Sequence, residues 1–193
     1  IEKNAAKKII SENNLLKLHK IISDDVMEQG NAGEFRKIAV RVGNYFPPKP
    51  ELVKHLTNEL LEWWNKLSSK WSPVITSAIL HHRFETIHPF GDGNGRTGRA
   101  LALWELYRRG FDTYHIFSVD EFYWEDRQGY YRALDKVRQQ NDDLTGWLMF
   151  ALILGMFGAA SEHHGLSIGW TVAATIGFTA FILTMGRWLI HRT

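Results

Sequence analysis

The chain has 193 residues, of which 45% are hydrophobic and 23% charged, which is typical of a globular protein rather than a disordered one. Its formal net charge of +2 is too small to argue for a nucleic-acid partner. The absence of cysteine excludes disulfide bonds and thiolate metal sites and is compatible with a reducing compartment. Because the chain begins with isoleucine, we expect a fragment or a processed product. Its first residues are polar and show no signal-peptide pattern.

The N-terminal part predicts two helices followed by a loop. Residues 3–12 and 14–23 have helical periodicity, and in the second range Leu15 and Leu18 recur on one face. Residues 24–33 are rich in turn formers and predict the loop.

A small β-hairpin is predicted after this loop. Residues Arg36–Val42 alternate apolar and polar side chains, which is typical of a half-buried strand. Gly43-Asn44 supplies a turn, and Tyr45-Phe46 predicts a short returning strand that Pro47-Pro48 ends.

Helices dominate the rest of the first 140 residues. Pro50–Leu67 has one continuous apolar face. Ser72-Pro73 supplies an N-cap and a proline at the first helical position, for a helix that ends near Ile87 because Pro89 follows.

Two more helices are predicted beyond a loop at residues 91–95. The first covers Arg96–Arg109. The second opens with a capping box of Ser118 and Glu121 and ends near Gln139.

The segment His88–Arg99, HPFGDGNGRTGR, joins a histidine at a helix end, a glycine-rich loop and a helix with two arginines. Gly93 and Gly95 have no side chains, so backbone N–H groups can approach phosphate oxygens. The loop leads into a helix N-terminus, which favours anions. Arg96 and Arg99 lie three residues apart on one helix face, where they can reach successive phosphates.

Three side chains of this segment have further chemical uses. Asp92 is a hard oxygen ligand beside the expected phosphates and suits Mg²⁺. Asn94 can hydrogen-bond a phosphate oxygen without adding charge. His88 lies across the loop from the arginines, where a neutral imidazole can take a proton from an attacking hydroxyl. Each feature alone is common in structural roles, but together and in this order they predict a nucleotide site.

This segment resembles the Fic-domain motif, His-x-Phe-x-(Asp or Glu)-Gly-Asn-Gly-Arg-x-x-Arg, at every defined position. These positions are His88, Phe90, Asp92, Gly93, Asn94, Gly95, Arg96 and Arg99. Further likeness covers about residues 1–150, including Leu15–His19, Tyr45–Pro48, Phe84–Ile87, Tyr130-Tyr131 and Asp143–Trp147. The resemblance implies a mostly α-helical, Fic-type catalytic domain over residues 1–150, a helical bundle with one small β-hairpin flap.

The resemblance also implies an activity, the transfer of AMP from ATP to a Ser, Thr or Tyr hydroxyl of a target protein with release of pyrophosphate. Within the motif it implies a general base, a Mg²⁺ ligand, an anion cradle, two clamps for the β- and γ-phosphates, and a core anchor. The base would be His88 and the Mg²⁺ ligand Asp92, while Gly93, Asn94 and Gly95 would form the anion cradle. Arg96 and Arg99 would be the phosphate clamps, and Phe90 the core anchor. Outside the motif, Arg41, Val42, Gly43 and Asn44 would form the flap that aligns the target by strand addition, and Tyr130 would line the adenosine pocket.

Alternative activities stay open. Members of the family use other nucleotides or a phosphocholine donor, and a kinase-like branch has Lys where this chain has Gly95. Gly95 and the two arginines favour AMP transfer but leave GTP or UTP open as donors. A catalytically silent module that binds nucleotide and a partner peptide is a further alternative, although such a module does not need His88.

Regulation is expected to come from outside the chain. Many family members carry an inhibitory helix, (Ser or Thr)-x-x-x-Glu-(Gly or Asn), but the nearest stretch, Lys8–Asn13, has Lys where Ser or Thr is needed. Glu2 and Glu12 are therefore interpreted as ordinary helix-surface acids. We expect a separate inhibitory element or antitoxin, and a homodimer stays open.

The C-terminal part, residues 151–193, is a hydrophobic tail. Residues 144–161 and 165–186 carry no Lys or Arg and are long enough to cross a bilayer as a hairpin, with basic residues flanking both on one side. This pattern predicts a cytoplasmic domain that is tethered to a membrane through residues 144–186. The alternative is that Leu144–Phe150 completes the catalytic fold and that atypical helices follow, through a fusion or a frameshift.

Overall fold

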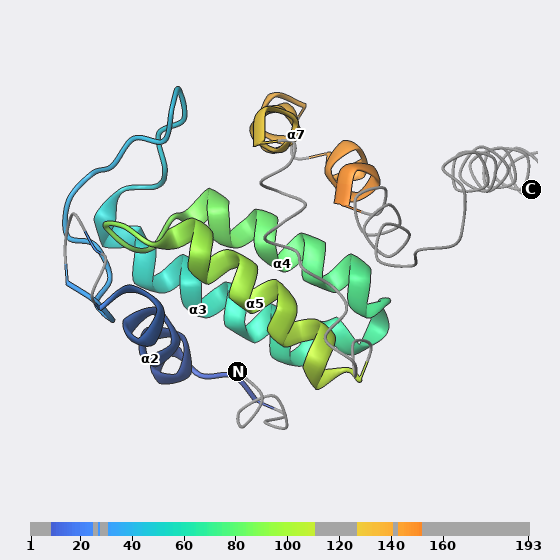
Figure 1. The fold of residues 1–193 in the computed structure, drawn as a ribbon, viewed down its shortest axis with the longest axis horizontal. Helices are drawn as coiled ribbons and strands as arrows, with labels where there is room; N and C mark the ends of the chain where they lie inside the picture. The colour runs from blue at the N-terminus through green and yellow to red at the C-terminus, as the bar shows by residue number, and fades with distance from the viewer. Residues whose placement is uncertain (1–8, 25–26, 28–30, 111–126, 141–142, 152–193) are drawn as a thin grey trace, which may run out of the picture.

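The computed structural model describes residues 9–24, 27, 31–110, 127–140 and 143–151, and these are mostly helical, as predicted. The helices are α2 (Glu12–Ser23), α3 (Pro50–Leu67), α4 (Pro73–Ile87), α5 (Asn94–Arg108) and α7 (Arg127–Gln139), with a 3-10 turn at Ser68–Lys70 and helical residues at 145–151. The helices α3, α4 and α5 lie side by side, and α2 and α7 lie on opposite sides of them (Figure 1).

Most helix ends lie where local sequence signals predict them. The bounds of α3 and α4 are as predicted, and α4 begins after its cap residue Ser72 with Pro73 in the first position. The helix α5 begins at Asn94, two residues before the predicted start. The helix α7 ends at Gln139 as predicted, whereas its predicted capping box lies outside the described residues.

The first predicted helix is wrong where the structure tests it. Residues 9–11 of the predicted range 3–12 are not helical, and the first eight residues of the chain lie outside the described part. The side-chain hydroxyl of Ser11 accepts a hydrogen bond from the Asn14 N–H at 3.3 Å, and Asn14 Oδ1 accepts the Ser11 N–H at 3.1 Å. This reciprocal cap satisfies two backbone donors and starts α2 at its observed position.

The acidic residue at the start of α2 has a structural partner. Glu12 accepts a hydrogen bond from Asn58 Nδ2 at 2.9 Å and lies 3.4 Å from Lys54 Nζ, both on α3. These contacts tie α2 to α3 and agree with the interpretation of Glu12 as an ordinary helix-surface acid.

The predicted strand over Arg36–Val42 is wrong. This segment pairs only through an isolated bridge between Val42 and Tyr45, closed by two backbone hydrogen bonds of 2.9 Å. The alternation of side chains misleads because the apolar face is only partly covered: Ile38 is 59% exposed, and Val40 and Val42 are half-buried. The side chain of Arg36 is buried instead. A two-stranded hairpin without a partner is marginally stable, and the loop obtains its hydrogen bonds elsewhere.

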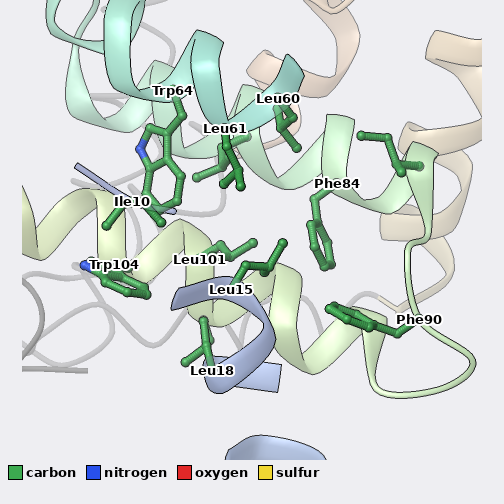
Figure 2. Packing of buried hydrophobic residues seen from close by; sticks show 13 residues of the cluster. Ile10, Leu15, Leu18, Leu60, Leu61, Trp64, Phe84, Phe90, Leu101 and Trp104 are labelled. Carbon is green, nitrogen blue, oxygen red and sulfur yellow. The ribbon is translucent and has the colours of Figure 1, made fainter. Parts of the chain in front are cut away.

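The main hydrophobic core lies between α2, α3, α4 and α5, and aromatic side chains are prominent in it (Figure 2). The indole rings of Trp64 and Trp104 meet edge to face at 6.1 Å. Trp64 Nε1 donates to the buried Glu105 carboxylate at 2.6 Å, so the polar edge of the ring is also satisfied. Phe90, from the motif loop, is fully buried in the same core and anchors the loop.

A glycine allows α4 and α5 to approach closely beside the motif. A Cβ atom at Gly98 would lie 2.6 Å from Glu85 Oε1, 3.1 Å from Phe84 Cδ1 and 3.2 Å from His81 Nδ1. These three side chains all belong to α4, so a larger residue at position 98 must displace these side chains or the helices that carry them.

We expect Gly98→Val to lower the free energy of unfolding by about 1–3 kcal/mol, because the added atoms overpack this contact. Gly146→Val is the matched control, since Gly146 is exposed and a Cβ there meets no atom closer than 4.0 Å. The control should stay within about 0.5 kcal/mol of the parent, as exposed substitutions usually do. Urea denaturation followed by circular dichroism measures both. Equal stability of the two variants would contradict the close approach.

The start of the apolar C-terminal part belongs to the fold. Trp147 is fully buried against Tyr130 and its Nε1 donates to the Ala78 carbonyl at 2.7 Å, which joins the helical residues 145–151 to α4 and α7. In the part of the chain that the structure describes, no helix is long and apolar enough to span a membrane. The predicted tail beyond residue 151 lies outside this part, so membrane tethering stays a prediction.

Candidate active site

His88 stands directly after α4 in an unusual backbone conformation. Its φ of 51° and ψ of 62° are left-handed, and it is the one non-glycine residue with a positive φ among the described residues. Left-handed backbone is uncommon for such residues and persists only where surrounding contacts hold it. The His88 N–H still bonds the Phe84 carbonyl at 2.9 Å, so the residue ends α4 and turns the chain into the motif loop.

Arg36 supplies the contacts that hold this turn. Its Nε donates to the His88 carbonyl at 2.8 Å, and its Nη2 lies 3.4 Å from the Ile87 carbonyl. The same guanidinium donates to the carbonyls of Pro48, at 2.5 Å, and Ile38, at 3.0 Å. One buried side chain therefore joins the end of α4 to the chain on both sides of the flap, residues 41–44. Sequence reasoning assigned Arg36 to a strand and missed this role.

We expect Arg36→Lys to lower the free energy of unfolding by at least about 2 kcal/mol, because a lysine cannot reproduce the planar fork and leaves carbonyls unsatisfied. Arg41→Lys is the matched control. Arg41 is exposed, donates to the Gly43 carbonyl at 2.6 Å and to Asn44 Oδ1 at 3.2 Å, and its guanidinium lies 5.4 Å from the centre of the Phe46 ring. Thermal unfolding by calorimetry compares the two. A control that loses as much as Arg36→Lys would contradict the assignment.

The motif loop is closed from within by Asn94. Its Oδ1 accepts the Phe90 N–H and its Nδ2 donates to the Phe90 carbonyl, both at 2.9 Å, and the side chain is only 2% exposed. The sequence predicted a bond from this side chain to a phosphate oxygen, but both of its polar atoms bond Phe90. A phosphate contact from Asn94 therefore falls to its backbone N–H.

The helix α2 supports the loop from below. His19 Nδ1 accepts the Gly33 N–H at 2.8 Å, so its proton is on Nε2, which lies 3.0 Å from the Asp92 carbonyl and donates to it. The imidazole also stacks on Phe90, with ring centroids 3.6 Å apart. Burial lowers the pKa of His19, although the bond to Asp92 raises it, so the ring is neutral as these bonds require. Gly93, with a φ of 76°, lies against Ser23 at the end of α2 and has no room for a side chain.

The start of α5 presents backbone donors beside two arginines. The first helical bond runs from Thr97 N–H to the Gly93 carbonyl at 3.0 Å, so the N–H groups of residues 94–96 precede the intrahelical ladder. Arg96 Nη2 lies 3.5 Å from Asp92 Oδ2, and both side chains are about one third exposed. Asp92 Oδ1 accepts the Gly93 N–H at 2.5 Å. The structure thus brings together the predicted cradle, the carboxylate and Arg96.

Arg99 reaches the same end of α5 across a glycine. A Cβ at Gly95 would lie 3.1 Å from Arg99 Nη1, so a side chain there would crowd the guanidinium. Burial raises the pKa of Glu85 on α4 to about 7, and the charge of Arg99 opposes this rise. Gly95 therefore has a local role in addition to its place in the predicted cradle.

The flap turn lies against α4 and α7. Tyr45 Oη donates to the Thr86 carbonyl at 2.9 Å, and the guanidinium of Arg138 lies 3.8 Å from the centre of the Tyr45 ring. A cavity of about 290 Å³ separates the turn from α7. Its lining consists of Val42, Gly43, Asn44, Glu85, Tyr131, Leu134, Asp135 and Arg138. Three of the four predicted flap residues thus face a hollow that begins one helical turn before His88.

Tyr130 lies in the core rather than in the lining of this cavity. Its ring is 5% exposed, and its hydroxyl lies 3.0 Å from His81 Nε2. The next residue, Tyr131, lines the cavity together with Arg138. The spacing of positions 131, 134, 135 and 138 places them on one face of α7, and this helical pattern is the signal that could have found them.

Two buried ionisable side chains face each other at the end of α4. Burial lowers the pKa of His88 to about 4. The backbone of Glu85 raises the pKa of His88, whereas the charges of Arg36 and Arg138 lower it. Burial raises the pKa of Glu85 to about 7, while Arg99 and Arg138 lower it. The His88 imidazole is therefore neutral at physiological pH.

A family model described as Fic/DOC family matches residues 9–106, more than half of the chain. The chain belongs to the Fic/DOC family. The matched range contains α2, the flap, α3, α4, the motif loop and most of α5, so the helices that build the Fic site are those of the family.

Several known proteins resemble this Fic domain. It is 36% identical over 127 residues to protein adenylyltransferase fic-1 of Caenorhabditis briggsae, covering 60% of this chain and 24% of that protein. It is 37% identical over 103 residues to protein adenylyltransferase Fic of Aedes aegypti, covering 53% and 20%. A solved Fic family protein from Desulfovibrio desulfuricans has a TM-score of 0.64 and 26% identity, covering 82% of this chain and 49% of that one. The chain thus spans a quarter or less of these two adenylyltransferases.

Proposed function

We propose that this Fic domain transfers AMP from ATP to a Ser, Thr or Tyr hydroxyl of a target protein. The observation that supports it best is the neutral His88 at the end of α4, one short loop away from a helix N-terminus with two arginines. The similarity to proteins named protein adenylyltransferase agrees with this order of groups. Nucleotide binding alone does not require a buried neutral imidazole at that position.

The phosphates of ATP would bind at the start of α5. Backbone N–H groups and the positive end of the helix dipole favour anions there, and Arg96 and Arg99 add charge-assisted hydrogen bonds. These groups would stabilise the charge that develops on the departing pyrophosphate.

Asp92 fits a role in holding Mg²⁺. Its carboxylate is partly exposed beside the loop, and Mg²⁺ is usually bound by one or two carboxylates together with phosphates and water. The described residues contain no group of three His, Cys, Asp or Glu that would form a cage made of protein ligands alone. When bound, the ion would neutralise phosphate charge.

His88 would act on the incoming hydroxyl. The imidazole would take the proton of the target hydroxyl while the hydroxyl oxygen bonds the α-phosphorus of ATP. The bond from that phosphorus to the bridging oxygen of pyrophosphate would break at the same time. The flap, residues 41–44, would align the target segment by backbone pairing next to this point. Exposed Phe46 and Ile38 flank the turn and offer apolar contacts to the target.

The reaction is tested by incubating the full chain in a cell lysate with ATP labelled at the α- or the γ-phosphate. We expect protein labelling from the α-position alone, and His88→Ala should reduce it by about 10²–10⁴-fold, the usual contribution of a general base. Label from the γ-position would show a kinase. No label from either would favour a binding module. Full labelling by His88→Ala would refute the base.

The protonation state of His88 can be measured directly. Because burial lowers its pKa to about 4, the ring should stay neutral as the pH falls from 8 to about 5 and should gain its proton only near pH 4. An NMR titration of the ring signals reads this, with His88→Gln identifying the resonance. A pKa at or above the ordinary value of about 6.5 would contradict the buried, neutral base.

A further inference from the structure

We propose that Glu85 is a positioning residue for His88, holding the imidazole with its proton on Nδ1 so that Nε2 is the proton acceptor. The role in AMP transfer rests on the proposed function, while the orientation of the ring does not. Glu85 Oε2 lies 3.7 Å from His88 Nδ1, and the two side chains are 8% and 16% exposed. Residues three apart on a helix lie on one side of it, which explains why they meet.

Each of these two side chains has a buried polar atom without a hydrogen-bond partner, although in Glu85 this atom is Oε1, beside Gly98, and not Oε2, which faces His88. Among the described residues, neither Glu85 Oε1 nor His88 Nδ1 has a hydrogen-bond partner. A buried polar group without a partner destabilises a fold, so a purely structural position would favour an apolar residue. The carboxyl next to the imidazole therefore indicates a use other than packing.

A second buried glutamate shows what a structural carboxylate looks like in this protein. Glu105 accepts from Trp64 Nε1 at 2.6 Å and from Arg108 Nε at 2.5 Å, and lies 3.3 Å from Arg109 Nη1. Its two oxygens are both engaged. Glu85 differs because its Oε1 has no hydrogen-bond partner among the described residues and its Oε2 lies 3.7 Å from His88 Nδ1.

The groups around Glu85 allow both the ionised and the neutral form of its carboxyl. Arg99 of α5 and Arg138 of α7 act on the carboxyl and favour its ionised form, whereas burial favours the neutral one. Arg138 is itself paired with Asp135 at 2.8 Å. The imidazole of His81, which is also on α4, lies beside Gly98 as the Glu85 carboxyl does. The fourth side is the cavity under the flap, which Glu85 lines.

The chemistry follows from this arrangement. A carboxylate accepts a hydrogen bond, so a proton on His88 Nδ1 is favoured and the lone pair is left on Nε2. When Nε2 takes the hydroxyl proton, the ring becomes a cation, and its Nδ1–H still points to the acceptor oxygen of Glu85. The proton passes from the hydroxyl to His88 alone, and Glu85 changes no bond of the substrate.

The test compares Glu85→Leu, Glu85→Gln and the control Ser77→Ala. The leucine removes the acceptor, whereas the glutamine keeps an acceptor oxygen without charge. Ser77 is buried on α4 and donates to the Ala102 carbonyl at 3.0 Å, so its change loosens the same helix pair away from His88. Ring ¹⁵N shifts of His88 report the tautomer without any substrate, and labelling from α-labelled ATP reports activity.

We expect Glu85→Leu to shift His88 toward the Nε2-protonated tautomer and to lower the maximal labelling rate by about 100-fold, the scale of a misplaced catalytic group, with little change in the ATP concentration for half-maximal rate. Glu85→Gln should keep the tautomer and retain most of the rate. Ser77→Ala should match the parent in both. An unchanged tautomer in Glu85→Leu would overturn the proposal, and so would an unchanged rate.

The test also decides the matter if Glu85→Leu does not fold or if the parent chain labels no protein. If Glu85→Leu does not fold, Glu85→Gln carries the test, and a shifted tautomer with lost activity in that variant would show that the charge itself is needed, against the acceptor role stated above. If the parent chain labels no protein but the tautomer shifts in Glu85→Leu, the proposed function fails while the positioning of His88 by Glu85 stands.

Discussion

The described fold depends on one buried guanidinium. Arg36 bonds the carbonyls of His88 and Ile87 at the end of α4 and those of Ile38 and Pro48, which lie before and after the flap. A left-handed residue at a helix end leaves carbonyls without helical partners, and a long loop leaves more. A single side chain with five donors in a plane satisfies four of them at once, which fixes the proposed base relative to the flap.

The anion site is shaped by contacts on its far side. Asn94 closes the loop onto Phe90, and His19 bonds the Asp92 carbonyl from α2. These bonds use the inward-facing groups of the loop and leave the first N–H groups of α5 directed away from them. Gly93 and Gly98 also help to shape the site. Gly93 lets α2 pack closely against the loop, and Gly98 lets α4 pack closely against α5. The loop is therefore held in one shape before any ligand binds, which reduces the cost of ordering it.

The end of α4 combines features that a stable core normally avoids. It has a left-handed non-glycine residue, a neutral imidazole, and a carboxyl oxygen, Glu85 Oε1, that has no hydrogen-bond partner among the described residues. Such features cluster at functional sites, where neighbouring packing compensates for them. Here the compensation comes from the aromatic core under Phe90 and from Arg36. Buried polar groups without partners, lying among well-packed helices, therefore indicate this site independently of the motif.

The sequence alone determined the order of chemical groups from His88 to Arg99 and the bounds of α3 and α4, because helix caps, prolines and glycines act on their immediate neighbours. Only the tertiary structure decided the fate of groups whose partners lie far along the chain. Arg36 bonds a carbonyl 52 residues away, so it cannot be recognised locally, and the alternation around it predicted a strand where the described residues form only the isolated Val42–Tyr45 bridge. Asn94 and Glu85 have partners only four and three residues away, but this spacing alone does not say whether each side chain turns toward the loop or toward a ligand. The packing of α7 against the core decides that Tyr131 rather than Tyr130 lines the cavity.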